Sequence, residues 1–439
     1  MTNSSQLQYV ISRISGFTTN HFKLMPNGSD TATANQIVRI ALPQNSLVNL
    51  KSFALHFDAE ITSAVGVGRL PPGIGIGSLI ERVEVSVGGL QIAAGSNFYN
   101  VLAMAKQAVM GDYCDPVLGH SEVIRNKSYV KSGAVADYEN KGSYVVNKFE
   151  GFLGSVSPSI VDLGLLPEMV ISITLAGNNV CIDATDDELD FTKGATSAAP
   201  VYTLTNIYAT VECMGMSDGT YEAMVAQQMS QVGYVELPFK NYLSFQDNTQ
   251  SNVKFSVASQ SISRIWIVHR ADNFADPSGA IGITGYLPPA GNDVSGVSQN
   301  DFLNTLDYNK EKYTSNYLNF PTVGANVKHW LTINGAMVPQ WQASECDMIE
   351  ITKNSVLGHK NQMRHGFLTQ TDNYSVYCVR LNLPESEHAN SITGLDSRGT
   401  NCQMFYNMAN LGVPKNVNIF VECDSSLRIG AAQQAEVLA

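Results

Sequence analysis

Apolar and polar residues alternate along much of the chain. Alternation with a period of two is typical of a β-strand with one buried face. It predicts strands at residues 36–42, 50–61, 80–87, 169–175, 202–213, 253–257, 263–269, 330–333, 374–383 and 417–423. The dipeptides Gly88-Gly89 and Asn334-Gly335 each follow a predicted strand, and both favour two-residue hairpin turns. The pattern therefore indicates a chain built mainly from antiparallel strands.

Apolar residues at helical spacing occur in only a few segments. Residues 97–110 and 344–357 show this spacing, and each segment is followed by a glycine that can stop a helix. A third predicted helix, residues 217–231, lies near the midpoint of the chain. Residues 66–77 and 272–301 are rich in Gly, Pro, Ser and Asn, so we expect long loops there.

An internal repeat organises the chain. Repeated segments occur in the same order in both halves: 38–42 resembles 253–257, 70–72 resembles 287–289, 83–111 resembles 329–358, and 206–213 resembles 416–423. The second match shares Leu-Pro-Pro, and the last shares Val-Glu-Cys. The spacing between matching segments changes only between strands, where loops tolerate length changes. Collinear matches of this kind indicate two copies of one structural unit.

The repeat predicts the domain organisation. We expect an N-terminal arm at 1–19, a first domain at 20–216, a connecting helix at 217–234, a second domain at 235–430 and a C-terminal tail at 431–439. Each copy holds enough strands and long crossing loops for a two-sheet sandwich. The predicted fold class is all-β, with two consecutive eight-stranded jelly-roll β-sandwiches (a double jelly roll) and a few short helices. Helices are too scarce for parallel βαβ winding.

Composition narrows the classes of partner. The chain has 27 Lys and Arg against 39 Asp and Glu, a net charge of −12, and lacks any Lys/Arg run, so we expect no direct nucleic-acid binding. Charged residues make up 15% of the chain, below the usual ~25%. Polar uncharged residues take their place, which fits a β-rich protein or one that buries much of its surface in partners.

The sequence also contains no long apolar stretch and no secretory signal pattern. No apolar run reaches the ~18 residues that a membrane-spanning helix needs. The 7 cysteines are scattered, without a Cys-x-x-Cys pair. We expect them to be buried, reduced thiols in a chain that is synthesised inside a cell.

Enzyme signatures are absent, so the sequence predicts no catalytic, cofactor-binding or metal-ligating residue. There is no G-x-S-x-G, H-E-x-x-H or phosphate-loop motif. His359 and His365 lie six residues apart, which suits neither a helix face nor a strand face for shared metal ligation. The acidic stretch from Asp183 to Asp190 has carboxylates that suit Ca²⁺ but lacks the register of a calcium loop. A solvated loop is its main interpretation, with a cation site left open.

The glycosylation sequons and the tryptophans each have a structural and a functional interpretation. Sequons for glycosylation occur at Asn3, Asn27, Asn126 and Asn373, but such short patterns arise by chance in Asn- and Ser-rich chains. The three tryptophans fall in strand-like segments, where we expect core positions rather than a sugar-binding platform: Trp266, Trp330 and Trp341.

Two consecutive jelly rolls, each with a strand, a Gly-Gly or Asn-Gly turn and a helix, resemble the double jelly-roll major capsid proteins of icosahedral DNA viruses. That group spans tailless phages, virophages, polinton-like viruses and large eukaryotic DNA viruses. The resemblance covers nearly the whole chain as architecture and involves no diagnostic motif. Residues 5–24 and 416–432 are also similar in character to the ends of such proteins.

The resemblance implies a viral structural protein without enzymatic activity. Its homotrimers would be pseudo-hexagonal, because three copies of two similar domains place six similar domains around one axis. Such trimers would tile an icosahedral shell. Implied partners are the chain itself, neighbouring trimers, and penton and minor capsid proteins, with an internal membrane left open. The implied location is the virion, after synthesis in the host cytoplasm, and the long loop at 272–301 would form an outward tower.

Two other functions remain open from the sequence. One is a carbohydrate- or receptor-binding β-sandwich protein, such as a lectin or spike, which predicts exposed aromatic residues. The other is a glycan-cleaving hydrolase built on two jelly rolls, which needs a pair of carboxylates in a cleft. The sequence nominates no such pair.

Overall fold

The structure is a computed structural model, and it describes a large part of the chain. The described residues are 17–62, 67–69, 73–93, 96–110, 121–122, 129–131, 141–184, 201–216, 225, 227, 230–249, 251–270, 320, 323–324, 326–356, 376–383, 393–399, 403–412, 414–430 and 433–438. Several sequence-based predictions lie outside them: both Leu-Pro-Pro segments, the loop at 272–301, residues 185–190, His359, His365, Asn3, Asn126 and Asn373.

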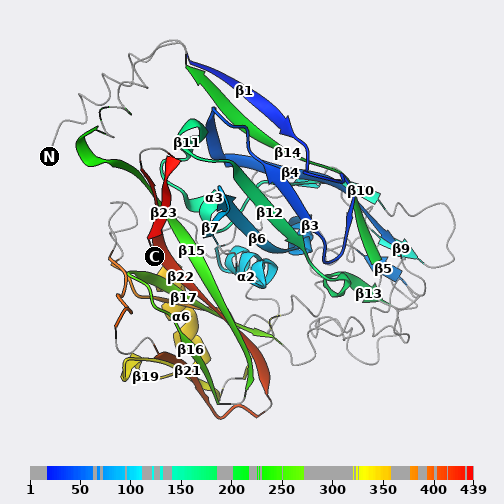
Figure 1. Ribbon diagram of the computed structural model, residues 1–439. Coiled ribbons are helices and arrows are strands. Elements are labelled where there is room, and N and C mark those ends of the chain that lie inside the picture. The colour runs from blue at the N-terminus through cyan, green and yellow to red at the C-terminus, as the bar shows by residue number, and fades with distance from the viewer. Residues whose placement is uncertain are drawn as a thin grey trace.

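The first half of the chain forms two main antiparallel sheets (Figure 1). One has the order β1 (Phe17–Leu24), β14 (Val201–Met216), β4 (Leu47–Thr62), β10 (Lys141–Val146), β8 (Ser121–Glu122), with β2 (Ala32–Thr33) on β14 and β11 (Ile160–Asp162) on β4. The other has the order β3 (Ile37–Ala41), β12 (Met169–Leu175), β6 (Ile80–Val87), β7 (Leu90–Ala93). A small third sheet joins β13 (Ile182–Ala184), β5 (Val67–Arg69) and β9 (Tyr129–Lys131).

The second half forms two antiparallel sheets with the same strand order. One is β15 (Tyr234–Thr249), β22 (Lys415–Gly430), β17 (Ile262–Arg270), β20 (Val376–Arg380), with β23 (Ala435–Leu438) on β22. The other is β16 (Asn252–Ser256), β21 (Gln403–Ala409), β18 (Lys328–Ile333), β19 (Ala336–Ala343). Each half has eight main strands: β1, β3, β4, β6, β7, β10, β12 and β14 in the first half, and β15 to β22 in the second. Numbered 1 to 8 along the chain, they form one sheet in the order 1-8-3-6 and another in the order 2-7-4-5. This pairing is the jelly-roll topology, so the predicted all-β double jelly roll is confirmed.

Helices are short and lie between strands. Among the described residues they include α2 (Tyr99–Met110), α3 (Phe152–Ser155) and α6 (Glu345–Val356), with the 3₁₀ segments η1 (Gly73–Leu79), η3 (Leu163–Leu165) and η4 (Asn178–Val180). The helices α2 and α6 occupy the same place in the strand order of the two rolls, as the repeat predicted. Among the described residues, no helix is long and apolar enough to cross a membrane.

The local sequence explains the strands and turns that were predicted. Side chains of β12 alternate strictly between buried and half-buried positions, because one face of the strand packs on the core. Both predicted hairpins form: Gly88-Gly89 joins β6 to β7, and Asn334-Gly335 joins β18 to β19. All four turn residues have positive φ, between +51° and +86°, which the two-residue turn requires.

The boundaries of the predicted arm, connector and tail differ from the observed elements. Strand β1 begins within the predicted arm, at Phe17, and β15 begins at Tyr234, the last residue of the predicted connector. Within that connector, residues 225, 227 and 230–232 are helical. The predicted C-terminal tail contains β23, which pairs with β22 from Ser426 to Ile429. It forms a strand because β22 extends past the end of β17 and offers unpaired backbone groups there.

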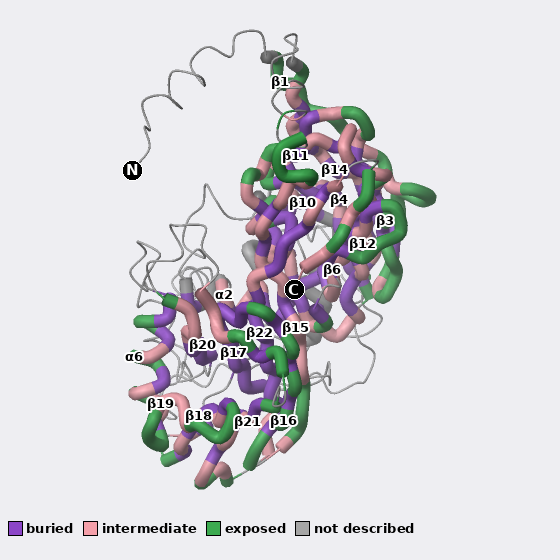
Figure 2. The backbone as a smooth tube through the Cα atoms, turned by 60° about the vertical axis from the view of Figure 1, so that its left-hand side comes forward, coloured by how far each residue is buried: buried purple, intermediate pink, exposed green. Residues whose placement is uncertain are grey.

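Buried residues lie inside each roll and also where the two rolls meet (Figure 2). One apolar cluster fills the second roll. The other fills the first roll and continues across the contact to include Trp266 and Phe420 of the second. Strand β17 is buried along its whole length because both of its faces are covered. The two rolls therefore pack through an apolar face.

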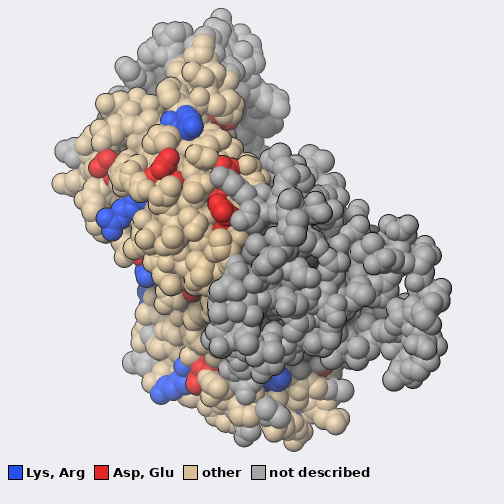
Figure 3. Space-filling model, turned by 90° about the vertical axis from the view of Figure 1, so that its right-hand side faces the viewer, with Lys and Arg blue, Asp and Glu red and all other residues tan. Residues whose placement is uncertain are grey.

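Charged groups are sparse on the described surface. On the face drawn in Figure 3, the Lys, Arg, Asp and Glu side chains of the described residues are scattered among uncharged residues. The described cysteines are free: Cys181, Cys213, Cys378 and Cys423 are buried as predicted, but Cys346 on α6 is exposed. Cys346 differs because it lies on the outer side of its helix.

Candidate functional site

The described residues place few of the sequence candidates together. Asp183 lies in β13, opposite Gly68 of β5, and Asn27 is exposed. Trp266 is buried as predicted and Trp330 is half-buried, but Trp341 on the edge strand β19 is 53% exposed, so its predicted core position is wrong. Within the described ranges, no group of three or more His, Cys, Asp and Glu residues is arranged to hold a metal ion.

The most organised set of polar side chains lies where the two rolls meet. Its centre is Glu422 on β22, whose side chain is 2% exposed. Arg264 donates from Nη1 to Oε1 of Glu422 at 3.0 Å, and Trp266 donates from Nε1 to Oε2 at 3.2 Å. Burial raises the pKa of Glu422, but the positive charges of Arg264, Lys106 and Lys240 outweigh burial and bring its pKa down to about 2. Glu422 is therefore a buried, fully ionised carboxylate.

Lys106 connects this carboxylate to the first roll. It projects from α2 with 12% of its side chain exposed and pairs with Glu150 of the same roll. Its ammonium also donates to Oη of Tyr242 at 2.9 Å, and Tyr242 donates to Oε2 of Glu422 at 3.3 Å. Burial lowers the pKa of Lys106, but Glu150 and Glu422 more than compensate and raise it. The network thus joins the two rolls through charge-assisted hydrogen bonds.

A second carboxylate on β22 extends the network within the second roll. Asp424 pairs with Lys240 of β15 and accepts hydrogen bonds from Ser261 at 2.6 Å and Ser263 at 2.8 Å. The backbone N–H of Lys240 also donates to Oγ of Ser155 in α3 at 2.7 Å. Each of these charges therefore has a partner of opposite sign.

Apolar side chains surround the network. The rings of Phe152 on α3 and Phe239 on β15 meet edge to face, with centroids 5.0 Å apart. The guanidinium of Arg270 on β17 lies over the ring of Phe98, 4.9 Å from its centroid. Arg270 itself is fully buried. Such contacts exclude water, which strengthens the electrostatic attraction inside the network.

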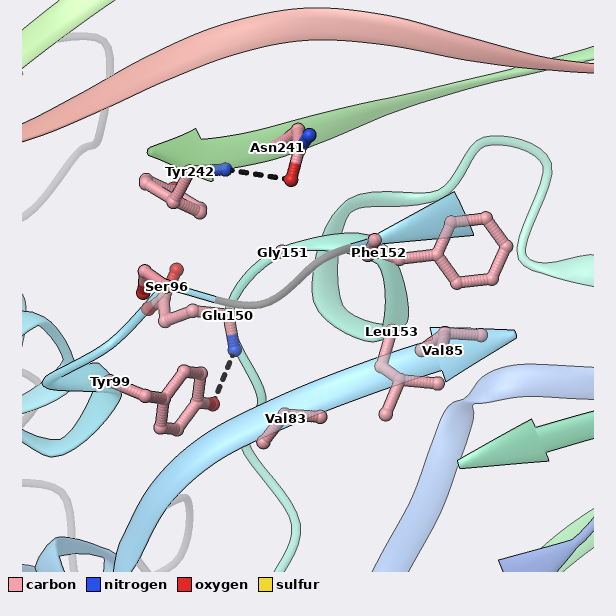
Figure 4. Close-up of a pocket in the computed structure, with 11 residues that line it drawn as sticks. Val83, Val85, Ser96, Tyr99, Glu150, Gly151, Phe152, Leu153, Asn241 and Tyr242 are labelled. Carbon is pink, nitrogen blue, oxygen red and sulfur yellow. Dashed lines mark hydrogen bonds between the residues drawn. The ribbon is translucent and has the colours of Figure 1, made fainter. Parts of the chain in front are cut away.

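A small cavity borders the network on the side of the first roll (Figure 4). Its walls include Val83, Tyr99 and Glu150 of the first roll and Tyr242 of the second, and its volume is about 20 Å³. That volume holds about one water molecule. The close-up shows the backbone N–H of Glu150 donating to Oη of Tyr99, at 2.7 Å. The arrangement can therefore fix two rolls to each other, and this cavity is too small for a substrate.

A separate buried cluster lies inside the second roll. His269 and His329 are both fully buried, and Oη of Tyr406 lies 3.0 Å from Nε2 of His269 and 2.7 Å from Nδ1 of His329. The remaining ring nitrogen of His329, Nε2, is buried without a hydrogen-bond partner. Burial, and to a smaller extent Lys328, lowers the pKa of His329 to about 4. His329 is therefore neutral in the folded chain at physiological pH.

Acid is expected to destabilise the second roll through His329. Because its pKa falls from the ordinary value 6.5 to about 4 on folding, the unfolded chain binds an extra proton between these values. Stability is therefore lost as pH falls from 6.5 to 4, by about 3 kcal/mol in total. His329→Asn keeps an amide near the Nδ1 position and should flatten this dependence in urea unfolding. The matched variant His21→Asn, at an exposed position, should keep it, and equal pH profiles for His329→Asn and the parent chain would contradict the assignment.

The inter-roll network was not predicted from the sequence. The repeat drew attention to Val-Glu-Cys at both 211–213 and 421–423, but only as a sign of duplication. The available signal was the charged residue Glu422 directly after the apolar residues 419–421 of β22. Its partners come from three other elements, β15, β17 and α2, so only the fold brings them together.

Comparison with known proteins places this geometry in a structural class. No protein-family model and no curated protein sequence matches the chain. Among solved structures, VP54 of PBCV-1, fitted into a reconstruction of the virophage Sputnik, aligns with a TM-score of 0.58 and 14% identity over 97% of this chain and 98% of that chain. The chain has the fold of a double jelly-roll capsid protein.

Two further solved structures support the same fold. A quasi-atomic model of the PBCV-1 virus capsid aligns with a TM-score of 0.55 and 14% identity, over 97% of this chain and 98% of that chain. The Faustovirus major capsid protein aligns with a TM-score of 0.53 and 8% identity, over 95% and 91%. Because these alignments span both rolls, the likeness extends to the whole double jelly roll, as the sequence-based resemblance anticipated.

Proposed function

We propose that the chain is a viral major capsid protein. The observation that carries the proposal is a double jelly roll that aligns, over 97% of its length, with PBCV-1 VP54. The Faustovirus major capsid protein supports it with a second alignment across both rolls. The buried charges between the rolls are paired with one another and fix the rolls together, which is a structural role. We therefore propose no enzymatic activity.

The assembled form follows from the duplication. We propose that residues 20–216 and 235–430 are two domains of one design and that three chains close into a ring of six similar domains. Closed cyclic symmetry uses one interface repeatedly, without leaving free ends. Such a ring has a pseudo-hexagonal outline and can tile an icosahedral shell. We propose a location in the virion, with neighbouring trimers and penton and minor capsid proteins as partners.

The mass of the purified chain tests this function. Three copies of the 47.5 kDa chain give about 142 kDa, and we expect this mass by light scattering, with three-fold particles by electron microscopy. A uniform population of 47.5 kDa monomers at every concentration would contradict the proposal. Cleavage or specific binding of glycans by such monomers would instead favour a hydrolase or a lectin.

A further inference from the structure

The two rolls carry the same carboxylate at the same place in the fold. On β22, Glu422 lies in register with Arg264 of β17, which donates to it at 3.0 Å. On β14, Glu212 lies in register with Asn49 of β4, which donates from Nδ2 to Oε2 of Glu212, also at 3.0 Å. The third strand of each roll thus donates a hydrogen bond to the carboxylate of the eighth strand, on β4 after a register shift between Ala54 and Asn49.

The neighbouring edge strands follow the same correspondence. Glu422 lies in register with Tyr242 on β15, and Glu212 lies in register with His21 on β1. Tyr242 receives a hydrogen bond from Lys106 of the first roll, whereas His21 is exposed. The outer face of β22 is therefore covered by the first roll, while the equivalent face of β14 is partly open to solvent.

The helices differ in the opposite sense: the outer side of α2 in the first roll is covered, and the outer side of α6 in the second roll is exposed. The buried positions of α2 and α6 match when each residue is paired with the one 247 positions later: Val101 with Met348, Ala105 with Thr352, and Val109 with Val356. In this register, Lys106 matches Lys353 and Leu102 matches Ile349. Leu102 is buried and the Lys106 side chain is only 12% exposed, but Lys353 is 51% exposed and Ile349 is 40% exposed. Lys353 forms a surface pair with Glu350 at 3.7 Å, which leaves its ammonium accessible.

Each chain therefore contains one contact between its own two rolls, and also the two surfaces that could form a second contact of the same kind. The completed contact joins α2 of the first roll to the β22 face of the second roll. The free halves are the outer side of α6, marked by Ile349 and Lys353, and the outer face of β14, marked by Glu212. A head-to-tail interface whose two halves remain on one chain can be repeated with another copy.

We propose that the outer side of α6 in one copy docks on the β14 face of the next copy, with Lys353 near Glu212. This contact reproduces between chains the arrangement that Lys106 and Glu422 make within one chain. The occupant is a second copy because its β14 face carries Glu212 at the position equivalent to Glu422, with a charge opposite to that of Lys353. The proposal rests on the proposed function, since it specifies the contact that closes the trimer.

The contact between copies is more polar than the contact within a chain. Beside Glu422, the outer face carries Trp266 and Phe420, both buried. Their register counterparts in the first roll are Ala54 and Thr210. A face that is exposed before assembly has to remain soluble, so large apolar side chains are replaced by small or polar ones. Interfaces that form between separately folded chains are more polar in the same way.

Charge reversal tests the proposed contact. The variants are Lys353→Glu, Glu212→Lys and the double exchange, with Lys254→Glu and Glu168→Lys as controls at exposed positions elsewhere. Each single reversal places like charges together, so the concentration needed for trimers should rise at least about tenfold. The double exchange should restore trimers because it recreates an opposite pair. Sedimentation velocity measures all of them, and circular dichroism checks that each chain is folded.

The outcomes distinguish an error in the proposed interface from an error in the proposed capsid function. The contact is supported if both single variants lose trimers, the double exchange recovers them and the controls keep them. Trimers that persist in both single variants, or a double exchange without recovery, overturn the contact but leave the capsid function standing if the parent chain forms trimers. A parent chain that never forms trimers overturns the proposed function itself.

Discussion

Substituting aspartate for Val211 or Val421 is expected to abolish folding of the chain. Both side chains are fully buried, Val211 in the core of the first roll and Val421 in the core of the second. Each precedes the glutamate of a Val-Glu-Cys segment and points to the opposite side of its strand, into the sandwich. A carboxylate there has no partner, and its burial costs several kcal/mol. That cost is comparable with the whole stability of a typical domain, about 5–15 kcal/mol.

The measurement is soluble yield with circular dichroism and thermal unfolding. Lys51→Asp on β4 and Lys254→Asp on β16 provide matched controls, because both lysines are exposed on strands of the same two rolls. These controls should fold normally. Full tolerance of both Val211→Asp and Val421→Asp would remove the argument that the two segments are equivalent core strands.

Removing the carboxylate between the rolls should produce the second largest effect. In Glu422→Ala, Arg264 keeps its buried position but loses the partner that neutralises it. Lys106 and Lys240 keep Glu150 and Asp424 as partners, so the charge left without compensation is that of Arg264. Breaking a buried ion pair in this way typically costs about 3–5 kcal/mol, because one charge remains desolvated without compensation. Urea unfolding should show the loss as a lower midpoint.

The internal repeat supplies the control for this experiment. Glu212→Ala removes the equivalent carboxylate from the open face of the first roll, where its partner is the neutral Asn49. We expect a loss of at most about 1 kcal/mol there. The double variant Glu422→Leu with Arg264→Met should recover much of the stability, because buried ion pairs can be replaced by apolar groups at little cost. Equal losses in Glu422→Ala and Glu212→Ala would contradict the structural role of the buried network.

Local patterns were sufficient where one strand face is buried and the other is open. The predicted strands at 80–87 and 169–175 coincide with β6 and β12 because β12 alternates with a period of two along its whole length and β6 does so from Val83 to Val87. The two hairpins could be predicted because Gly88-Gly89 and Asn334-Gly335 tolerate the positive φ that the turns demand. The helices α2 and α6 were predicted to within two residues at each end.

Long-range contacts explain the strands that were missed. Strand β15 contains Pro238 and several polar residues, so its alternation is weak. It is an edge strand that pairs with β22 along its length, and an edge position tolerates a proline. Strand β23 in the predicted tail forms only because β22 extends beyond β17. Neither strand could be recognised without its partner.

The amino-acid sequence by itself indicated two copies of one unit of strands, a hairpin turn and a helix, with a jelly roll as the leading fold for each unit. The sheet topology then established the jelly-roll strand order. Periodicity and turn residues act locally, so their effect can be predicted from neighbours in the chain. Only the tertiary structure decided which of two equivalent residues is buried. Glu212 and Glu422 occupy the same repeat position, yet Glu422 alone is enclosed by a roll from the other half of the chain. Burial there depends on a contact between rolls, which no local pattern records.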